Sequence, residues 1–457
     1  MSKLKHDILL RSVKLSNAII ITTIFAVCWF CYYSDRISYP FYKRGNYLII
    51  LLYFVIYIIV GRLYEAFVIS MHRITEMVYA QFLSVGITNG ITYIVIWLLS
   101  KKLPAVFPLL AVFVCQLVAD IIWSKLAQWW YFRTFPTSKM AIVYDRYKGI
   151  NDMIRNYGLN RKYDVRLKIR ACDCLKNLDS LKGMKTVFLS GVHSHDRNII
   201  LKYCIANGID VLVIPRIGDV IMSGAYPMHV FHLPVLRVGR YMVKPEYLFI
   251  KRVSDIVISV VALVLLSPVM LITTIAIKAE DRGPALYKQI RLTKDGKKFE
   301  ILKFRSMRVD AEKDGVARLS SGENDDRITS VGHVIRRFRI DELPQLINII
   351  RGDLSICGPR PERPEIAEKY CKEMPEFELR LQAKAGLTGY AQVYGKYNTN
   401  PYDKLQMDLM YIAHPSIFED LKIMLTTVKI LFKAESTEGI EEENTDSLTQ
   451  GEKYGNI

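Results

Sequence analysis

Four apolar runs near the start of the chain restrict what it can fold into. They cover residues 15–33, 47–64, 74–99 and 103–126. A helix needs about 20 apolar residues to cross the hydrocarbon core of a bilayer, and each run approaches or exceeds that length. The first run lacks a small-residue cleavage site, so we expect it to remain as an anchor. The sequence therefore predicts a four-helix transmembrane domain over residues 1–130.

Basic residues that flank these runs bear on their orientation. They precede the first run at Lys3, Lys5, Arg11 and Lys14 and follow it at Arg36, Lys43 and Arg44. Basic residues favour the cytoplasmic side, so we expect a cytoplasmic N-terminus, although the second group weakens the bias. Four crossings return the chain to the side where it began. The rest of the protein is therefore expected to face the cytoplasm.

A different pattern begins after the fourth run. Short β-branched runs at 141–144, 186–189 and 211–214 alternate with helical stretches, as is typical of parallel strands in an α/β domain. The first of these runs leads into Asp145, without the G-x-G-x-x-G fingerprint that a dinucleotide site needs. We interpret residues 139–245 as a degenerate Rossmann-like domain. A scaffold or dimerisation role is preferred over nucleotide binding.

A fifth apolar run covers residues 253–277 and contains a proline. Its 25 residues would extend about 37 Å as a helix, enough to span a bilayer. Pro268 follows Ser267, and a proline inside a helix removes one hydrogen bond, so a bend or break is expected there. The freed carbonyl could be satisfied by Ser267. Basic residues flank both ends, which favours a re-entrant helix over 252–278 that enters the membrane and turns back.

The remaining sequence reads as a separate domain with an acidic tail. A hairpin is predicted from 286–292 and 299–304, joined at Asp295-Gly296. Apolar residues recur at helical spacing over 418–432, which suits either a helix on the membrane surface or ordinary core packing. From 434 to 457 the chain has seven acidic residues and one lysine, so this stretch is predicted to be a disordered tail.

The net charge points to an anionic partner. The chain has 62 Lys and Arg against 45 Asp and Glu, a formal net charge of +17. Nucleic acid, acidic lipid and a phosphorylated substrate all remain consistent with this excess. A nucleic-acid-binding protein would show stacking aromatics or a recognition helix, and five apolar segments would have no place in it. We therefore expect no nucleic-acid partner.

One basic region surrounds two adjacent acids. Arg336, Arg337 and Arg339 precede Asp341 and Glu342, Arg360 follows, and Lys303 and Arg305 lie upstream. In one interpretation Asp341 only caps a helix that runs to about residue 350, with Glu342 complementing its dipole. In the other, a carboxylate surrounded by cations serves phosphoryl transfer, where charge on the transferred group must be neutralised. The motifs of P-loop enzymes, α/β-hydrolases and zincins do not occur.

The order of short motifs resolves this choice. From 251 to about 432 the chain resembles the catalytic module of bacterial polyprenyl-phosphate hexose-1-phosphate transferases, and its front resembles their long form. The matching residues are Lys251-Arg252 with Asp255, Ser267-Pro268, Gly283-Pro284, Gln289 with Arg291, Lys303 to Met307, Asp326 to Thr329, Asp341 to Gln345, Gly358 to Pro361, and Gly386 to Gly389. The resemblance implies a monotopic α+β catalytic domain over 246–433, in the bacterial inner membrane and facing the cytoplasm.

The resemblance also implies a reaction. A UDP-hexose would donate hexose-1-phosphate to undecaprenyl phosphate with release of UMP, the priming step of exopolysaccharide, capsule or O-antigen synthesis. Asp341 matches the nucleophile that forms a covalent phosphosugar, and Glu342 matches the ligand of Mg²⁺. Arg336 and Arg360 match positions near the phosphates, and Lys303 and Arg305 are further phosphate-binding candidates.

Several alternatives stay open at this point. Lys303 and Arg305 could instead form ion pairs that stabilise the fold. A membrane scaffold that organises other glycan enzymes is the competing function, and the intact set of Asp341, Glu342, Arg336 and Arg360 argues against it. Ala385 stands where many family members have proline, away from the chemistry. The hexose is undetermined, and a homo-oligomer through the membrane or central domain is left open.

Overall fold

The computed structural model describes residues 3–42, 44–145, 162–308, 327–395 and 400–431. The predicted acidic tail at 434–457 and Asp326 of the motif set lie outside these residues. The chain forms two compact units, Met1–Ile214 and Pro215–Ile457. Residues 215–245, which we assigned to the central domain, belong to the second unit.

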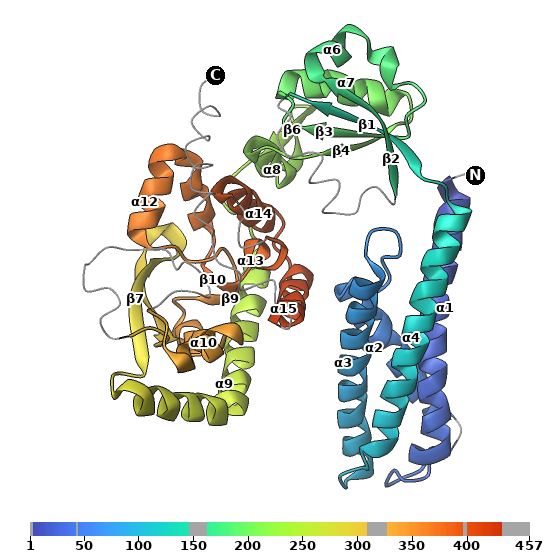
Figure 1. Ribbon diagram of the computed structural model, residues 1–457, viewed down its shortest axis with the longest axis vertical. Coiled ribbons are helices and arrows are strands. Elements are labelled where there is room, and N and C mark those ends of the chain that lie inside the picture. Colours follow the sequence, from blue (N-terminus) through green and yellow to red (C-terminus); the bar gives the residue numbers. More distant parts are fainter. Residues whose placement is uncertain (1–2, 43, 146–161, 309–326, 396–399, 432–457) are drawn as a thin grey trace. The chain divides into compact units, whose positions relative to one another are not determined.

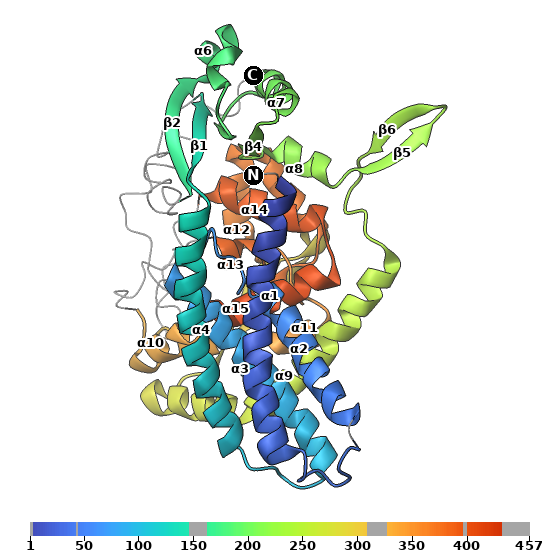
Figure 2. The same cartoon turned by 90° about the vertical axis from the view of Figure 1, so that its right-hand side faces the viewer.

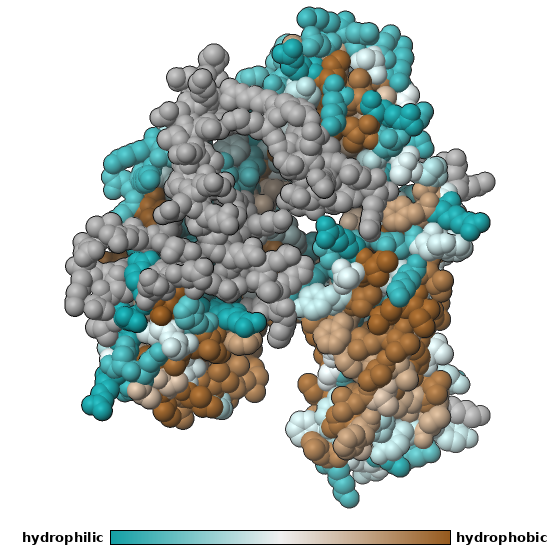
Figure 3. Space-filling view, in the orientation of Figure 1, coloured by the Kyte–Doolittle hydropathy of each residue, from teal (hydrophilic) through white to brown (hydrophobic). Residues whose placement is uncertain are grey.

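Four long helices begin the first unit. They are α1 (Lys3–Cys28, extended by a π-helical turn at Trp29–Tyr33), α2 (Arg44–Leu63), α3 (Ile74–Ser100) and α4 (Phe107–Thr134). All four are long and apolar enough to cross a membrane. Figure 3 shows apolar side chains gathered on the outside of this bundle. An apolar exterior of this extent fits lipid better than water, so the predicted membrane helices are supported.

The interior of the bundle is polar as well as aromatic. Tyr53 donates to Asn89 Oδ1 at 2.8 Å, and Asn89 donates to Gln116 Oε1 at 2.9 Å. In a second set, Tyr57 and Asp120 both bond to Asn17, at 2.7 and 2.8 Å. Since lipid offers no hydrogen-bond partners, polar side chains of membrane helices are expected to face one another. These bonds join all four helices.

An α/β region completes the first unit. It has four parallel strands in the order β2-β1-β3-β4. The strands are β1 (Ser138–Tyr144), β2 (Tyr163–Arg170), β3 (Thr186–Ser190) and β4 (Asp210–Val213), with helices α6 (Ala171–Lys176) and α7 (Ser194–Ala206) and the 3₁₀ turn Leu178–Leu181. The predicted parallel α/β region is confirmed. Strand β2 was not predicted, because charged residues alternate with apolar ones along it and no continuous β-branched run marks it.

The second unit begins with elements that precede the predicted catalytic domain. Helix α8 (Ile217–Ser223) buries Ile217 and Val220 in the main core of the unit. Gln406 of helix α14 (Pro401–Ala413) also donates to the carbonyl of Pro215. Strands β5 (Tyr226–Val230) and β6 (Leu233–Arg237) form an antiparallel hairpin that projects away from its unit in Figure 2.

Helix α9 (Pro245–Asp281) contains the fifth apolar run. Figure 1 shows it descending along the unit and then turning sharply, so that its second half runs along the lower edge. Pro268 lies inside the helix, and Ser267 Oγ donates to the carbonyl of Val264 at 2.8 Å. Val264 lies four residues before Pro268, so this is the carbonyl that the missing proline N–H leaves without its helical donor. The sequence explains both the bend and its local compensation.

The first half of α9 is anchored by polar contacts. Arg252 donates to the carbonyls of Ile349 and Ile350 at 2.6 and 2.7 Å, at the end of helix α11 (Gln345–Arg351). The buried carboxylate of Asp255 accepts from Ser355 Oγ at 2.8 Å and from the N–H of Ile356 at 3.1 Å. These contacts give Arg252 and Asp255 of the motif a structural role.

The remaining elements of the second unit follow α9 along the chain. They are the hairpin of β7 (Leu286–Leu292) and β8 (Lys298–Phe304), the parallel pair β9 (Ser355–Cys357) and β10 (Gly386–Thr388), helices α10 (Ser330–Arg337), α12 (Pro364–Glu373), α13 (Tyr390–Tyr394) and α15 (Ile417–Leu431), and 3₁₀ segments at Lys294–Gly296, Ile340–Glu342 and Pro375–Gln382. The predicted β7–β8 hairpin is confirmed. Helix α15 buries Ile423 but exposes Phe418, Leu421 and Val428, so one face packs in the core and the opposite face carries exposed apolar side chains.

Candidate active site

Asp341 and Glu342 lie in a short 3₁₀ turn between α10 and α11. Arg339 ends the preceding segment with φ at +52°, a left-handed conformation that reverses the chain and turns the two acids inward. Only 9% of Asp341 is exposed. Helix α11 begins after Pro344 and has no side-chain cap, so Asp341 does not cap it. The helix-cap interpretation is therefore wrong in this structure.

Three cations surround the Glu342 carboxylate. Lys303 Nζ lies 3.5 Å and Arg360 Nη2 3.3 Å from Oε1, and Arg339 Nη1 lies 3.7 Å from Oε2. Burial alone would raise the pKa of Glu342, but the charges of Lys303, Arg360 and Arg339 outweigh it and lower that pKa. Glu342 is consequently ionised at neutral pH, and its charge holds the cations together.

Asp341 has a different environment from its neighbour. No hydrogen bond or ion pair of its carboxylate is found among the residues that the structure describes. Burial and the negative charge of Glu342 raise the pKa of Asp341, while Lys303, Arg336 and Arg339 oppose the rise. A poorly solvated carboxylate with cations nearby is suited to attack an anionic phosphorus centre, because little water must be displaced first.

The predicted phosphate-binding residues divide into two groups. Lys303, Arg336 and Arg360 lie beside the acidic pair, as their contacts or charge effects show. Arg305 does not join them, because its guanidinium pairs with Asp281 at the end of α9. The ion-pair alternative therefore describes Arg305. Arg339, which we noted only as part of the basic stretch, contacts Glu342 three residues along the chain.

The second half of α9 supports the turn that carries Asp341. Ile277 packs in one cluster with Phe304 of β8 and Ile335 of α10, and Ile340 packs against that cluster. Glu280 accepts from the N–H groups of Ser330 and Val331 at 2.8 and 3.3 Å, at the start of α10. A carboxylate there satisfies free N–H groups and complements the helix dipole. The bent membrane helix is thus part of the framework of the site.

Close backbone packing explains two of the glycine motifs. The N–H of Gly358 donates to the carbonyl of Thr388, and the N–H of Gly386 donates to the carbonyl of Pro359, both at 2.9 Å. A Cβ atom at Gly358, Gly386 or Gly389 would overlap the backbone of the facing segment. The two motifs therefore lock together, and this contact sets the path of the chain into Arg360.

The acidic pair offers only part of the ligand shell that a divalent cation needs. Within the described ranges, no group of three or more His, Cys, Asp or Glu side chains is placed to hold a metal ion. Mg²⁺ usually takes only one or two protein carboxylates and completes its shell with water and substrate phosphate oxygens. Glu342, beside Asp341 and among phosphate-binding cations, is consistent with that kind of site.

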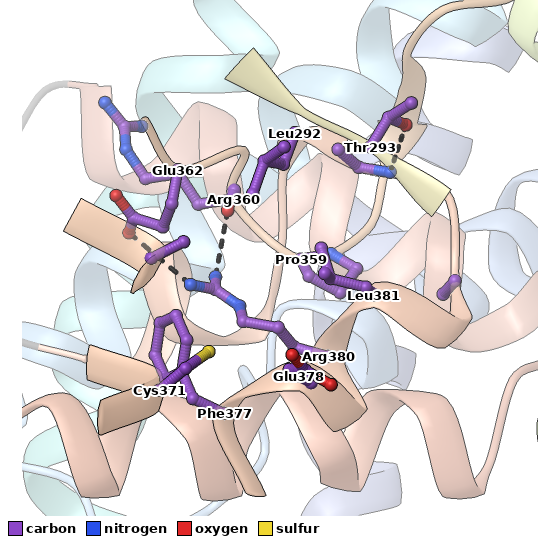
Figure 4. A pocket seen from close by; sticks show the side chains of 13 residues that line it. Leu292, Thr293, Pro359, Arg360, Glu362, Cys371, Phe377, Glu378, Arg380 and Leu381 are labelled. Atoms are coloured by element: carbon purple, nitrogen blue, oxygen red, sulfur yellow. Dashed lines mark hydrogen bonds and ion pairs between the residues drawn. The ribbon is translucent and has the colours of Figure 1, made fainter. Parts of the chain in front are cut away.

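A small cavity lies beside Arg360, as Figure 4 shows. Its lining includes Arg360, Glu362, Arg380, Phe377 and Cys371. Its volume is about 20 Å³, enough for about one water molecule and far too little for a sugar nucleotide. The cavity is a gap in packing behind Arg360, and the acidic pair remains the candidate site.

Comparison with known proteins agrees with this arrangement. Residues 246–434 match the family described as bacterial sugar transferase. The chain is 41% identical over 191 residues to the UDP-glucose:undecaprenyl-phosphate glucose-1-phosphate transferase of Caulobacter vibrioides, covering 41% of this chain and 71% of that protein. It is 48% identical over 136 residues to the putative undecaprenyl-phosphate N-acetylgalactosaminyl 1-phosphate transferase of Bacillus subtilis, covering 30% of this chain and 75% of that protein. The chain belongs to the bacterial sugar transferase family.

A longer relative matches over a smaller share of its length. The UDP-N-acetylgalactosamine-undecaprenyl-phosphate N-acetylgalactosaminephosphotransferase of Aeromonas hydrophila is 39% identical over 203 residues, covering 44% of this chain and 48% of that protein. The chain thus matches about half the length of this relative. The names of the relatives also differ in the sugar. Family membership therefore leaves the hexose undetermined.

Proposed function

We propose that this protein transfers hexose-1-phosphate from a UDP-hexose to undecaprenyl phosphate and releases UMP. The observation that carries the proposal is the buried Asp341 carboxylate beside Glu342, with Lys303, Arg336, Arg339 and Arg360 around the pair. A site of this charge pattern can hold a diphosphate and present a nucleophile to it. The product, an undecaprenyl-diphosphate hexose, would prime exopolysaccharide, capsule or O-antigen synthesis.

The first step is attack by Asp341. An oxygen of its carboxylate forms a bond to the sugar-bearing phosphorus of UDP-hexose, and the bond from that phosphorus to the bridging oxygen breaks. UMP leaves with the electron pair, so no proton has to be moved. Arg336 and Arg360 are assigned to the phosphate oxygens, where forked donors can bind two oxygens at once. The result is a hexose-1-phosphate bound covalently to Asp341.

The second step regenerates the enzyme. A phosphate oxygen of undecaprenyl phosphate attacks the same phosphorus, and the bond to Asp341 breaks. The carboxylate returns to its ionised form and the lipid diphosphate sugar departs. Lys303 lies near both acids and is assigned to balance the charge that the site gains and loses during the two steps.

A Mg²⁺ ion is part of the proposal, with Glu342 as its protein ligand. When bound, it would neutralise charge on the diphosphate and on the departing UMP. Glu342 already collects three cations, so binding of the metal and substrate would redistribute these contacts.

The proposed topology follows from the substrates. UDP-sugars are cytosolic, so Asp341 would face the cytoplasm, and α9 would enter the inner membrane and return at the Ser267-Pro268 bend. The exposed apolar side chains along the bent part support this placement: Val264, Leu265, Leu271, Ile272 and Ile275. Because the second half of α9 supports the Asp341 turn, a re-entrant helix would keep the site near the lipid headgroups, where the acceptor phosphate lies.

The experiment is a donor panel with the full-length protein in lipid nanodiscs. UDP-glucose, UDP-galactose, UDP-N-acetylglucosamine and UDP-N-acetylgalactosamine are each supplied with Mg²⁺, with and without undecaprenyl phosphate, and UMP is measured. At least one donor should give continuous UMP release that needs the acceptor. Without acceptor, that donor should give a burst of at most about one UMP per enzyme, as expected for a covalent intermediate. Absence of UMP release with every donor would refute the proposal.

A further inference from the structure

The segment that carries Arg360 has no regular secondary structure, yet it is held at every residue. Two of its residues, Pro359 and Pro361, have no N–H to donate, so only their carbonyls can anchor the backbone. Pro359 O accepts from the N–H of Gly386 at 2.9 Å, and Glu362 O accepts from the N–H of Leu292 at 3.0 Å. The two carbonyls between them, of Arg360 and Pro361, accept from side chains.

Arg380 supplies the first of these side-chain donors. Its Nη2 donates to the carbonyl of Arg360 at 2.9 Å. The same guanidinium pairs with Asp408 at 2.6 Å and with Glu362 at 3.5 Å. Figure 4 shows it between the Glu362 carboxylate and the Arg360 carbonyl. Because only 6% of the Arg380 side chain is exposed, the contact is shielded from competing water.

Arg291 supplies the second donor, from strand β7 on the other side of the segment. Its Nη1 donates to the carbonyl of Pro361 at 3.0 Å, and its Nη2 donates to Gln289 Oε1 at 2.7 Å. Glu362 Oε2 lies 3.9 Å from Arg291 Nη1, so one carboxylate lies between the two arginines. The motif of Gln289 with Arg291 thereby gains a role that its sequence did not indicate.

A buried ion pair is a poor source of stability on its own. Apolar side chains of similar volume often stabilise a core as well or better, since charged groups lose hydration on burial. Here the two arginines also fix the position of the backbone. Each guanidinium donates to one carbonyl of the segment that carries Arg360, and the Arg360 side chain in turn contacts Glu342. Lysine could keep the charge at either position, but its ammonium lacks the planar fork that reaches the carbonyl and a carboxylate together.

We propose that Arg380 and Arg291 are positioning residues that fix the backbone of Arg360 and so aim its guanidinium at the donor diphosphate. This inference deepens the proposed function and rests on it, since it takes Arg360 as a phosphate-binding residue. Neither arginine touches substrate in this account. Their effect on turnover passes through Arg360 alone, which makes the proposal separable from a general role in folding.

The test is a double-mutant cycle in the full-length protein. Arg380→Lys, Arg291→Lys and Arg360→Ala are made singly, and each lysine variant is combined with Arg360→Ala. Two quantities are measured: kcat/KM for UMP release with the most active donor of the panel, and the Kd for UDP by calorimetry. The Kd completes the cycle for variants whose turnover is too slow to measure. Each lysine variant should lower kcat/KM about tenfold alone, since small misplacements of a substrate-binding group are costly. In the Arg360→Ala background the further loss should be less than about twofold.

Two controls separate positioning from stability and from the proposed function. Arg240, which pairs with Asp295 at 2.8 Å on the surface of the same unit, is changed to lysine and should leave kcat/KM within about twofold. Thermal unfolding midpoints are recorded for every variant. If Arg380→Lys does not fold, Arg291→Lys tests the positioning role on its own. Equal losses with and without Arg360 would overturn the positioning role. No UMP release by the unmodified protein would instead contradict the proposed function.

Discussion

The four-helix bundle of the first unit and the transferase core of the second both bury polar side chains, but of different kinds. In the bundle the buried groups are mainly amides and hydroxyls, such as Asn17, Asn89 and Gln116, with Asp120 as the buried acid among them. The transferase core buries charged groups, including Asp341, Arg380 and Asp408. Neutral bonds can fix helix packing in lipid at modest cost, whereas buried charges are expensive unless each is paired. The difference fits an assembly role for the first interior and the proposed chemistry for the second.

Replacing the proposed nucleophile should have the largest effect. Asp341→Asn keeps the size of the side chain but removes the charge that attacks phosphorus, so we expect UMP release to fall at least about a thousandfold. The protein should still enter the membrane, because Asp341 has no hydrogen bond or ion pair with other described residues. Turnover near that of the unmodified protein would contradict the covalent mechanism.

Changing the neighbouring acid should have a smaller effect of a different kind. Glu342→Gln removes the charge that gathers Lys303, Arg339 and Arg360, and it weakens the proposed metal ligand. We expect UMP release to fall about a hundredfold and the Mg²⁺ concentration for half-maximal rate to rise. Glu300→Gln, which loses an exposed pair with Lys288, is the matched control and should change neither. An unchanged Mg²⁺ titration in Glu342→Gln would exclude that residue as the ligand.

Straightening α9 tests whether the membrane segment belongs with the chemical site. Pro268→Leu restores an N–H that can bond Val264, so the bend should relax and the support from Ile277 and Glu280 should shift. We expect activity to fall about tenfold or more, with the acidic pair untouched. Single cysteines near Lys251 and Lys278, in a chain without its eight native cysteines, report the sidedness of each end by labelling with an impermeant thiol reagent in intact cells.

Both cysteines should be protected until the membrane is opened, and in Pro268→Leu the one near Lys278 should become accessible from outside. Val269→Leu, an exposed apolar exchange next to the bend, is the control and should behave like the unmodified protein. Full activity of Pro268→Leu with unchanged labelling would show that the bend does not support the site.

The smallest effect is expected inside the bundle. Asp120→Asn keeps a partner for Asn17 and removes a charge, so UMP release should stay within about twofold, as single interhelical hydrogen bonds in membranes are worth only about 0.6 kcal/mol. A large loss of UMP release with normal membrane insertion would mean that the bundle interior takes part in chemistry, and the contrast between the two units would then fail.

The site residues divide by how far their contacts reach along the chain. Asp341, Glu342, Arg336 and Arg360 were predicted as site residues because the order of short motifs resembles a known family. Ser267 and Pro268 were found because a proline acts on its own helical turn. Contacts made across the fold were missed or misplaced: Arg305 pairs with Asp281, and Arg380 reaches the carbonyl of Arg360 from a different segment. Spacing along a sequence cannot show such contacts, because tertiary packing creates them.

Predictions of the fold likewise succeeded where the signal is local in the sequence and failed where tertiary contacts decide. Apolar run length predicted the membrane helices, and β-branched runs predicted three strands of the parallel sheet. Strand β2 was missed because its outward residues are charged. Helix α8 was not foreseen as part of the transferase core because it is short and buries two residues, Ile217 and Val220, in that core. A short helix with two buried residues leaves almost no periodic signal.

Trapping the covalent intermediate tests the central claim most directly. The full-length protein is mixed with the active UDP-sugar and Mg²⁺ without lipid acceptor, quenched in acid, digested and analysed by mass spectrometry. The account predicts a hexose-phosphate adduct on the peptide that contains Asp341, lost when undecaprenyl phosphate is added before the quench and absent from Asp341→Asn. UMP release that depends on the acceptor from the first turnover, with no adduct on Asp341, would contradict it.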